Sequence, residues 1–374
     1  MAINRKLWGK TPDGKPIYKY TLTNASGASV VLGSIGAAIV SVNVPDRNGK
    51  LADVALGYGK AESYFGDGPY LGKVPGRFAN RIAKGKFTLD GKAYSVPVNC
   101  GPNHLHGGPD GFSNQVWESR KRKGGVEFKY VSADGEMGYP GQVVVVARYE
   151  WSEENELRLT FTAKSDRRTV INLTNHAYFN LNGGGSILRQ FLKLNCSEYL
   201  PTDPTLIPLG EPEPVAGTPM DFLNGKTLGR DIKKDFPALN YGKGYDGCWV
   251  IDGYCKGQLQ EAAELWSNRS GRTLKVYTTQ PGLQVYTGNW LGGCPQGKRG
   301  RIYHDYDGVA LECQHFPDSP NQPAYPSTVL KPGKNFHEAI IYAFGAYFFD
   351  STEKEEKSCF PSRSLSAERT ASRS

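Results

Sequence analysis

Two segments of this sequence place a proton-transferring side chain inside an otherwise strand-like stretch. His176 lies in the Asn-rich run 171–181, and Glu312 lies in the apolar run 309–314. A neutral imidazole gives or accepts a proton near pH 7, whereas a carboxylate in an apolar strand is costly unless it is paired or used. Both are candidates for acid–base chemistry. A core histidine held by neighbouring amides and a glutamate on the solvent face of a sheet fit the same patterns.

A third candidate is the pair His104 and His106. Two histidines two residues apart on a strand share one face and can bind a metal. The nearest carboxylate is Asp110, which follows a Gly-Gly-Pro break, and no further histidine is near in sequence. We therefore predict no metal here and a structural role for at least one of the two. No G-x-G-x-x-G follows a predicted strand, and Met220 stands where a P-loop needs its first glycine, so no nucleotide cofactor is predicted.

The elements that must position these residues have a period of two, which is typical of β-strands. Short helices are predicted only at 60–65 and 259–265. Turn signals between many short strands favour an all-β protein, a large antiparallel β-sandwich. Strands are predicted as a pair within 30–44, a hairpin about Asp90-Gly91 within 88–96, a hairpin of 142–151 with 156–164, and separate strands at 273–279 and 283–287.

Length and composition agree with this fold class. The chain has 374 residues with 45 Gly and 24 Pro, as expected for many turns, and it shows no internal linker. One domain is therefore predicted over residues 1–349. Residues 350–374 are rich in serine and balanced in charge, and are predicted to be a disordered polar tail.

Charge and cysteine usage restrict the partners. The net charge is +8, but the basic residues are scattered, and the densest run, 120–123, precedes Gly-Gly and is typical of a solvated hairpin end. We expect no nucleic-acid partner and, without an 18-residue apolar stretch, no membrane partner. Seven cysteines without C-x-x-C spacing favour reduced thiols and a cytoplasmic protein.

Five segments, in order along the chain, resemble the signatures of the aldose 1-epimerase (galactose mutarotase) family. They span nearly all of residues 5–349. The segments are Gly76-Arg77-Phe78-Ala79-Asn80-Arg81-Ile82-Ala83-Lys84-Gly85, Asn103-His104-Leu105-His106-Gly107-Gly108, Asn172-Leu173-Thr174-Asn175-His176, Gln280-Pro281-Gly282-Leu283-Gln284-Val285-Tyr286-Thr287-Gly288-Asn289, and Leu311-Glu312-Cys313-Gln314 with Asn321-Gln322-Pro323.

The resemblance implies a supersandwich fold and the interconversion of α and β anomers of free aldohexoses such as galactose and glucose, without cofactor or metal. It implies Glu312 as general base, His176 as general acid and His106 as an assisting group near the ring oxygen. The sugar hydroxyls would be held by Asn80, Arg81, Asp246 and Gln284. One departure from the family pattern is that Asp246 is followed by Gly247-Cys248 rather than by histidine. The expected partner is a small aldose, and the expected state is a monomer or homodimer.

Other functions remain possible from sequence. A non-catalytic carbohydrate-binding protein of the same fold would keep the sugar-holding residues but would not need both Glu312 and His176. A glycoside hydrolase needs two carboxylates that flank one bond. A sugar-phosphate mutarotase would need a basic cluster near the site segments, and none is apparent.

Overall fold

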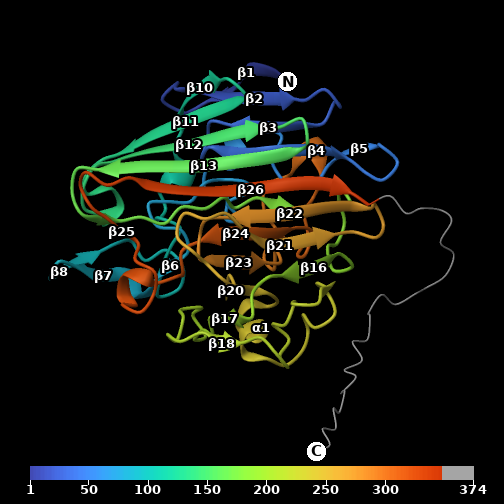
Figure 1. The fold of residues 1–374 in the computed structure, drawn as a ribbon. Coiled ribbons are helices and arrows are strands. Elements are labelled where there is room, and N and C mark those ends of the chain that lie inside the picture. Colours follow the sequence, from blue (N-terminus) through green and yellow to red (C-terminus); the bar gives the residue numbers. More distant parts are fainter. Residues whose placement is uncertain (348–374) are drawn as a thin grey trace, which may run out of the picture.

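The computed structural model describes residues 1–347, which form antiparallel β-sheets (Figure 1). The predicted tail at 350–374 lies outside the described residues. The first sheet has five strands in chain order: β1 (Ala2–Lys10), β2 (Pro16–Thr23), β3 (Ser29–Gly33), β4 (Ala38–Pro45) and β5 (Leu51–Asp53). The strand pair predicted within 30–44 is confirmed as β3 and β4.

The second sheet has nine strands. Its strands, in spatial order, are β10 (Glu118–Arg122), β11 (Gly125–Ser132), β12 (Val143–Trp151), β13 (Glu156–Ser165), β26 (Phe336–Ala346), β22 (Arg272–Thr278), β21 (Gln260–Trp266), β16 (Phe191–Leu194) and β19 (Lys226–Thr227). The predicted hairpin of β12 with β13 and the hairpin end at 120–123 are confirmed. Strand β26 lies between β13 and β22 and so joins hairpins from the two halves of the chain (Figure 1).

The third sheet carries the candidate residues. Its six strands, in spatial order, are β15 (Tyr178–Phe179), β24 (Val309–Gln314), β23 (Gly282–Tyr286), β20 (Asp246–Val250), β17 (Glu198–Tyr199) and β18 (Glu213–Pro214). Along β24 the odd-numbered side chains Val309, Leu311 and Cys313 enter the main hydrophobic core. Because successive side chains on a strand alternate between faces, Glu312 points to the opposite face.

Small ribbons and short helices complete the described chain. The ribbons pair β6 (Arg81–Ile82) with β9 (His104–Leu105), β7 (Lys86–Leu89) with β8 (Lys92–Ser95), and β14 (Thr169–Val170) with β25 (Val329–Leu330). The β7–β8 hairpin confirms the turn predicted at Asp90-Gly91. Residues 237–242 form α1 (Pro237–Gly242), and single 3-10 turns lie at Ala61–Tyr64, Ala83–Gly85, Phe112–Asn114, Glu136–Gly138, Lys298–Gly300 and Ser319–Asn321. No helix within residues 1–347 is long and apolar enough to cross a membrane.

One predicted helix is wrong. The segment 259–265 is rich in Ala, Glu and Leu, which favours a helix locally, yet it forms strand β21. Strands β16 and β22 pair with it on both sides, and its inward residues Ala263 and Leu265 are buried. Sheet pairing and burial together outweigh a helix propensity worth tenths of a kcal/mol per residue. The predicted helix at 60–65 is present as the 3-10 turn Ala61–Tyr64.

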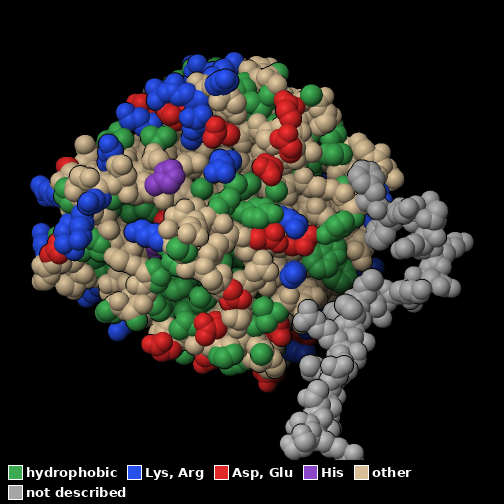
Figure 2. Space-filling model, in the orientation of Figure 1, with side chains coloured by type: hydrophobic (Ala, Val, Ile, Leu, Met, Phe, Trp, Pro, Cys, Tyr) green, Lys and Arg blue, Asp and Glu red, His purple; other side chains and the backbone are tan. Residues whose placement is uncertain are grey.

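The surface agrees with the modest net charge. Figure 2 shows Lys and Arg side chains concentrated toward the β10–β11 side of one face, with acidic side chains lying among them. Arg120 and Arg122, at the end of that hairpin, both form ion pairs with Glu127. This region therefore presents mixed charge rather than a continuous basic stripe.

Candidate active site

The six-stranded sheet aligns polar side chains from three of its strands on one face. In register, Glu312 lies opposite Gln284, and Asp246 lies opposite Tyr286. Paired residues on neighbouring strands point to the same side, and residues two apart on one strand do so as well. Strand pairing alone thus brings Glu312, Gln284 and Asp246 together, although they are far apart in sequence.

The ribbon of β6 and β9 supplies the other side of the site. Arg81 pairs with Leu105 in this ribbon, so the chain leaves β9 at His106 beside Arg81. His106 has a left-handed φ of 52°, and Gly107 follows with a φ of 84°. A Cβ at Gly107 would lie 1.8 Å from the carbonyl oxygen of Gly76, so only glycine fits this turn. The turn directs His106 into the site.

These segments enclose a cleft of ≈ 250 Å³ that contains all seven site residues proposed from sequence. Its lining also includes aromatic side chains that the sequence did not single out. The cleft is lined by Gly68, Pro69, Tyr70, Asn80, Arg81, Cys100, Leu105, His106, His176, Tyr178, Leu206, Asp246, Gln284, Tyr286, Trp290 and Glu312.

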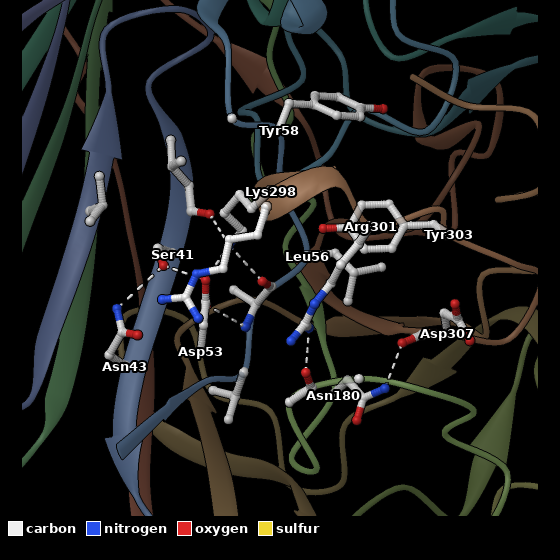
Figure 3. Close-up of a pocket in the computed structure, with 18 of the residues that line it drawn as sticks. Ser41, Asn43, Asp53, Leu56, Tyr58, Asn180, Lys298, Arg301, Tyr303 and Asp307 are labelled. Atoms are coloured by element: carbon white, nitrogen blue, oxygen red, sulfur yellow. Dashed lines mark hydrogen bonds and ion pairs between the residues drawn. The ribbon is translucent and has the colours of Figure 1, made fainter. Parts of the chain in front are cut away.

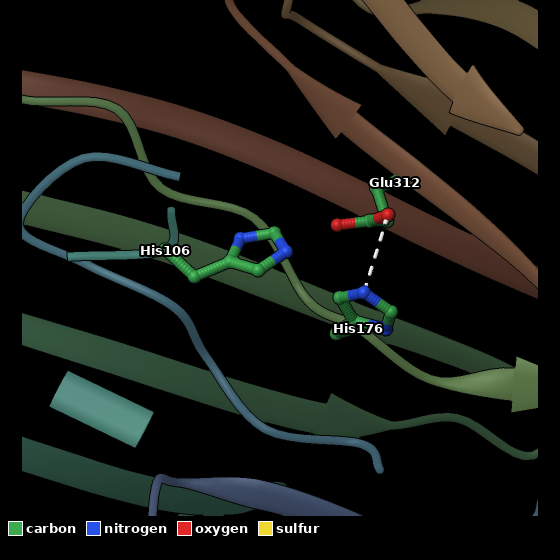
Figure 4. Close-up of side chains that lie close together, drawn as sticks. All are labelled: His106, His176 and Glu312. Atoms are coloured by element: carbon green, nitrogen blue, oxygen red, sulfur yellow. Dashed lines mark ion pairs between the residues drawn. The ribbon is translucent and has the colours of Figure 1, made fainter. Parts of the chain in front are cut away.

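Glu312 and His176 face each other at the buried end of this cleft. Oε1 of Glu312 lies 3.5 Å from Nε2 of His176, and the two side chains are 2% and 6% exposed (Figure 4). Within residues 1–347, no hydrogen-bond partner meets Oε2 of Glu312 or Nδ1 of His176. His176 is therefore not a core histidine satisfied by amides, and Glu312 is not a solvent-facing sheet residue. Both remain available to a ligand.

Burial sets the protonation of this pair. It raises the pKa of Glu312 well above its ordinary value, with the charge of Asp246 acting in the same direction and that of Arg81 opposing it. It lowers the pKa of His176 to about 3. Desolvation disfavours the charged form of either group. For the pair with one proton, burial therefore favours a carboxylic acid beside a neutral imidazole over an ion pair.

His106 is held in one tautomer by the backbone. Its Nδ1 accepts a hydrogen bond of 3.1 Å from the backbone N–H of Asn80. The other nitrogen, Nε2, must then carry the proton of the neutral ring. Burial lowers the pKa of His106 well below its ordinary value, so the ring stays neutral near pH 7. Its centroid lies 5.2 Å from that of His176, which makes His106 a neutral hydrogen-bond donor next to the acid–base pair.

His104 has a different role from His106. Its Nδ1 lies 2.6 Å from the carbonyl oxygen of Pro97, and its Nε2 lies 2.5 Å from the hydroxyl of Tyr139. Both ring nitrogens are used inside the fold, and burial lowers the pKa of His104 to about 4. The structural role predicted for one histidine of the pair therefore belongs to His104.

Asp246, Gln284 and Arg81 form a polar wall opposite the histidines. Nε2 of Gln284 donates a hydrogen bond of 2.6 Å to Oδ1 of Asp246, and Nη2 of Arg81 lies 3.8 Å from Oδ2 of Asp246. Burial raises the pKa of Asp246, and Arg81 and Gln284 oppose this change. Such a wall offers both donors and acceptors to vicinal hydroxyl groups.

Aromatic rings surround the two histidines. The Tyr70 ring lies 4.8 Å from that of His106 and 6.0 Å from that of His176, and Tyr178 lies 5.0 Å from His176. Tyr178 follows His176 by two residues, and Tyr286 follows Gln284 by two, so the period of two could have identified both. Tyr70 and Trp290 lie in loops, where the sequence carries no such signal.

A buried ion pair lies next to the backbone segment that bonds to His176. Nζ of Lys73 pairs with Asp67, and both side chains are fully buried. The carbonyl of Lys73 accepts the backbone N–H of His176 at 2.9 Å, and the backbone N–H of Gly72 donates to the carbonyl of His176 at 2.9 Å. The position of His176 is therefore tied to the segment that the pair anchors.

The same cluster contains potential metal ligands. One ligand atom from each of His106, His176 and Glu312 lies within 4.8 Å of the other two. Two histidines and a carboxylate are a known ligand set for divalent metals. Nδ1 of His106 is already used by Asn80, so this residue could ligate only through Nε2 and would have to lose its proton there.

Comparison with known proteins shows the family of this chain. The family model described as aldose 1-epimerase matches residues 18–343. A galactose mutarotase of Sus scrofa is 40% identical over 346 residues, which are 92% of this chain and 99% of the relative. An aldose 1-epimerase of Escherichia coli strain K12 is 37% identical over 338 residues, which are 89% of this chain and 96% of the relative. The solved structure of an aldose epimerase homologue from C. elegans superimposes with a TM-score of 0.80 at 31% identity. The match covers 87% of this chain and 98% of the homologue. The chain belongs to the aldose 1-epimerase family.

Proposed function

We propose that this protein interconverts the α and β anomers of free aldohexoses, galactose and glucose among them, by opening and reclosing the sugar ring. The observation that carries the proposal is the Glu312–His176 pair, whose buried side chains lie 3.5 Å apart in a cleft that polar side chains line. Anomerisation requires one group that removes a proton and one that supplies a proton. The reaction needs no net exchange of electrons or groups.

Ring opening assigns a role to each member of the pair. The Glu312 carboxylate accepts the proton of the C1 hydroxyl while His176 donates a proton to the ring oxygen O5. The C1–O5 bond breaks and an aldehyde forms at C1. This step uses the ionised form of the pair, which contains as many protons as the neutral form. Transfer across the 3.5 Å between the two groups therefore prepares the catalyst without exchange with solvent.

Reclosure reverses these roles. Rotation about C1–C2 presents the other face of the aldehyde to O5, and the Glu312 carboxylic acid returns its proton to O1 while His176 takes the proton from O5. His106 donates a hydrogen bond from Nε2 near the ring oxygen. Asn80, Arg81, Asp246 and Gln284 hold the remaining hydroxyls, so that only C1 and its oxygen turn.

Polarimetry of freshly dissolved α-D-galactose and α-D-glucose, with and without the protein, tests this function. The proposal predicts faster decay to the equilibrium rotation. An unchanged rate together with measurable sugar binding would instead indicate a carbohydrate-binding protein. Release of the aglycone from an aryl glycoside would indicate a hydrolase, because Asp246 gives the cleft a second carboxylate.

We also propose that the protein acts in the cytoplasm as a monomer or homodimer. The six cysteines among residues 1–347 are free thiols, which favours a reducing compartment. Size-exclusion chromatography with light scattering measures the oligomeric state, and a trimer or larger assembly would contradict the proposal.

A further inference from the structure

A second and larger cavity lies apart from the Glu312 cleft. It has a volume of ≈ 760 Å³ and opens between β2–β4, the segment 53–59, the glycine loop 183–185 and the loop 298–307 (Figure 3). No residue among 1–347 lines both cavities. A volume in this range is typical of pockets for small ligands.

At one end of this cavity, the charges of Lys298 and Asp53 neutralise each other. Nζ of Lys298 contacts Asp53 at 2.6 Å and donates to the carbonyl oxygens of Val40 at 2.5 Å and Ala55 at 2.8 Å, which uses all three of its protons. Asp53 also accepts a hydrogen bond of 2.5 Å from Ser41. This pair leaves no charge for a ligand to neutralise, but it fixes the shape of the cavity.

The rest of the cavity carries a surplus of positive charge. Lys19, Arg299 and Arg301 line it, and within residues 1–347 no carboxylate pairs with any of the three. The one other lining carboxylate, Asp307, accepts the backbone N–H of His304 at 2.9 Å. Burial lowers the pKa of Lys298, Asp53 opposes this change, and the charges of Arg301 and Arg299 add to the lowering. Arg299 and Arg301 therefore act electrostatically on Lys298.

Both arginines belong to the loop that contains Lys298. Arg299 is exposed and has a left-handed φ of 56° in the turn Lys298–Gly300. Nη1 of Arg301 donates a hydrogen bond to the carbonyl oxygen of Gly183. A Cβ at Gly184 would lie 3.1 Å from the same Nη1, so the absence of a side chain there permits the approach. The remaining guanidinium protons of Arg301 are free of carboxylates.

Groups suited to the rest of a polar ligand lie around these cations. The Trp8 ring has its Nε1 fixed by a hydrogen bond of 3.1 Å to the carbonyl oxygen of Gly59, and Nζ of Lys19 lies 5.8 Å from the ring centroid. Asn43 contributes an amide group from β4, whereas the hydroxyl of Ser41 is already bonded to Asp53. A flat ring beside Lys19, in a cavity that two arginines also line, matches a ligand that has an organic body and an anionic end.

We propose that this cavity binds a small phosphorylated metabolite, a phosphate monoester whose phosphate lies at Arg299 and Arg301 and whose organic part lies against Trp8, Lys19 and β4. Arginine forks match phosphate oxygens in geometry and retain their charge at every physiological pH. The site is separate from the sugar cleft, and its ligand is distinct from the neutral aldose of the proposed function.

Calorimetric titration of the full chain at low salt tests this proposal with glucose 6-phosphate, AMP and inorganic phosphate as probes. Saturable single-site binding is expected for at least one ester, with an affinity about tenfold or more above that of inorganic phosphate. The two esters distinguish a sugar phosphate from a nucleotide. Equal affinity for inorganic phosphate, or no saturable binding of either ester, would overturn the proposal.

A double substitution locates the site. Arg299→Gln with Arg301→Gln should weaken ester binding about tenfold or more, because two charge-assisted hydrogen bonds are lost. The matched control is Arg120→Gln with Arg167→Gln, which removes the same charge from exposed positions elsewhere. Equal weakening in the control would reduce the effect to net charge and overturn the proposal.

A third variant separates this inference from the proposed function. Glu312→Gln changes the sugar cleft alone, so ester binding should persist in it and should not be displaced by galactose. Loss of ester binding in Glu312→Gln, or displacement by galactose, would place the ester in the sugar cleft and overturn the proposal. Galactose mutarotation should be unchanged in the double arginine variant, whose substitutions lie outside the cleft.

Discussion

The pH dependence of the reaction depends on where Glu312 and His176 titrate. Burial lowers the pKa of His176 from 6.5 to about 3, a displacement that corresponds to about 5 kcal/mol in favour of the neutral imidazole. It raises the pKa of Glu312 above 4.5. At pH values between the lowered pKa of His176 and the raised pKa of Glu312, the pair carries one proton. Catalysis requires this one-proton form of the pair.

The single proton on the pair determines how activity changes at low and at high pH. Activity falls at low pH when His176 is protonated while Glu312 is still a carboxylic acid, and it falls at high pH when Glu312 loses its proton beside a neutral His176. The acid limb of kcat/KM therefore belongs to the imidazole and the alkaline limb to the carboxylic acid, the reverse of their ordinary order. We expect a bell with its acid limb below about pH 5.

Polarimetry of α-D-galactose across the pH range measures this profile, after subtraction of the spontaneous rate at each pH. Circular dichroism at the same pH values identifies any loss caused by unfolding. An acid limb centred near 6.5 in a folded protein would refute the reasoning, because it would mean that burial does not control the pKa of His176.

Four further predictions concern other parts of the structure. Arg81→Gln should raise the KM for galactose about tenfold, through loss of a charge-assisted hydrogen bond; steady-state polarimetry measures this, and an unchanged KM would remove Arg81 from the sugar site. Lys73→Met should lower the free energy of unfolding in urea by about 3–5 kcal/mol, because Asp67 is left buried without its cation; unaltered stability would show that the pair contributes little. Gly107→Ala should lower the thermal midpoint and, if it folds, the activity, since its Cβ meets the Gly76 carbonyl; a wild-type melting curve would contradict the close approach. Dialysis against a chelator should leave the mutarotation rate unchanged, and a loss that zinc restores would show that His106, His176 and Glu312 hold a metal.

Much of the fold was predictable because its strands alternate and its hairpins are local. The β12–β13 hairpin and the turn at Asp90-Gly91 carry their own signals, and the structure confirms both. The segment 259–265 carried a misleading signal, since its pairing partners β16 and β22 decide its conformation. The boundary of a single domain at residue 349 stays a prediction.

The sequence indicated which residues belong to the candidate site, but it could not indicate how those residues are arranged. Five segments contain six of its seven residues, Asp246 lies outside those segments, and all seven line one cleft. No local pattern could give the register of β24 against β23 and β20, which places Glu312 beside Gln284 and near Asp246. The same limit applies to the second cavity, because the arginines at 299 and 301 and the glycine loop near 184 meet only in the folded chain.

The central claim is that Glu312 and His176 together carry the proton transfers, and the most direct measurement is the mutarotation rate of Glu312→Gln and His176→Asn at neutral pH. Each variant should lose about 10²–10⁴-fold in kcat, while calorimetry still detects galactose binding and circular dichroism still shows the native fold. Wild-type kcat in a folded Glu312→Gln or His176→Asn variant would contradict the account.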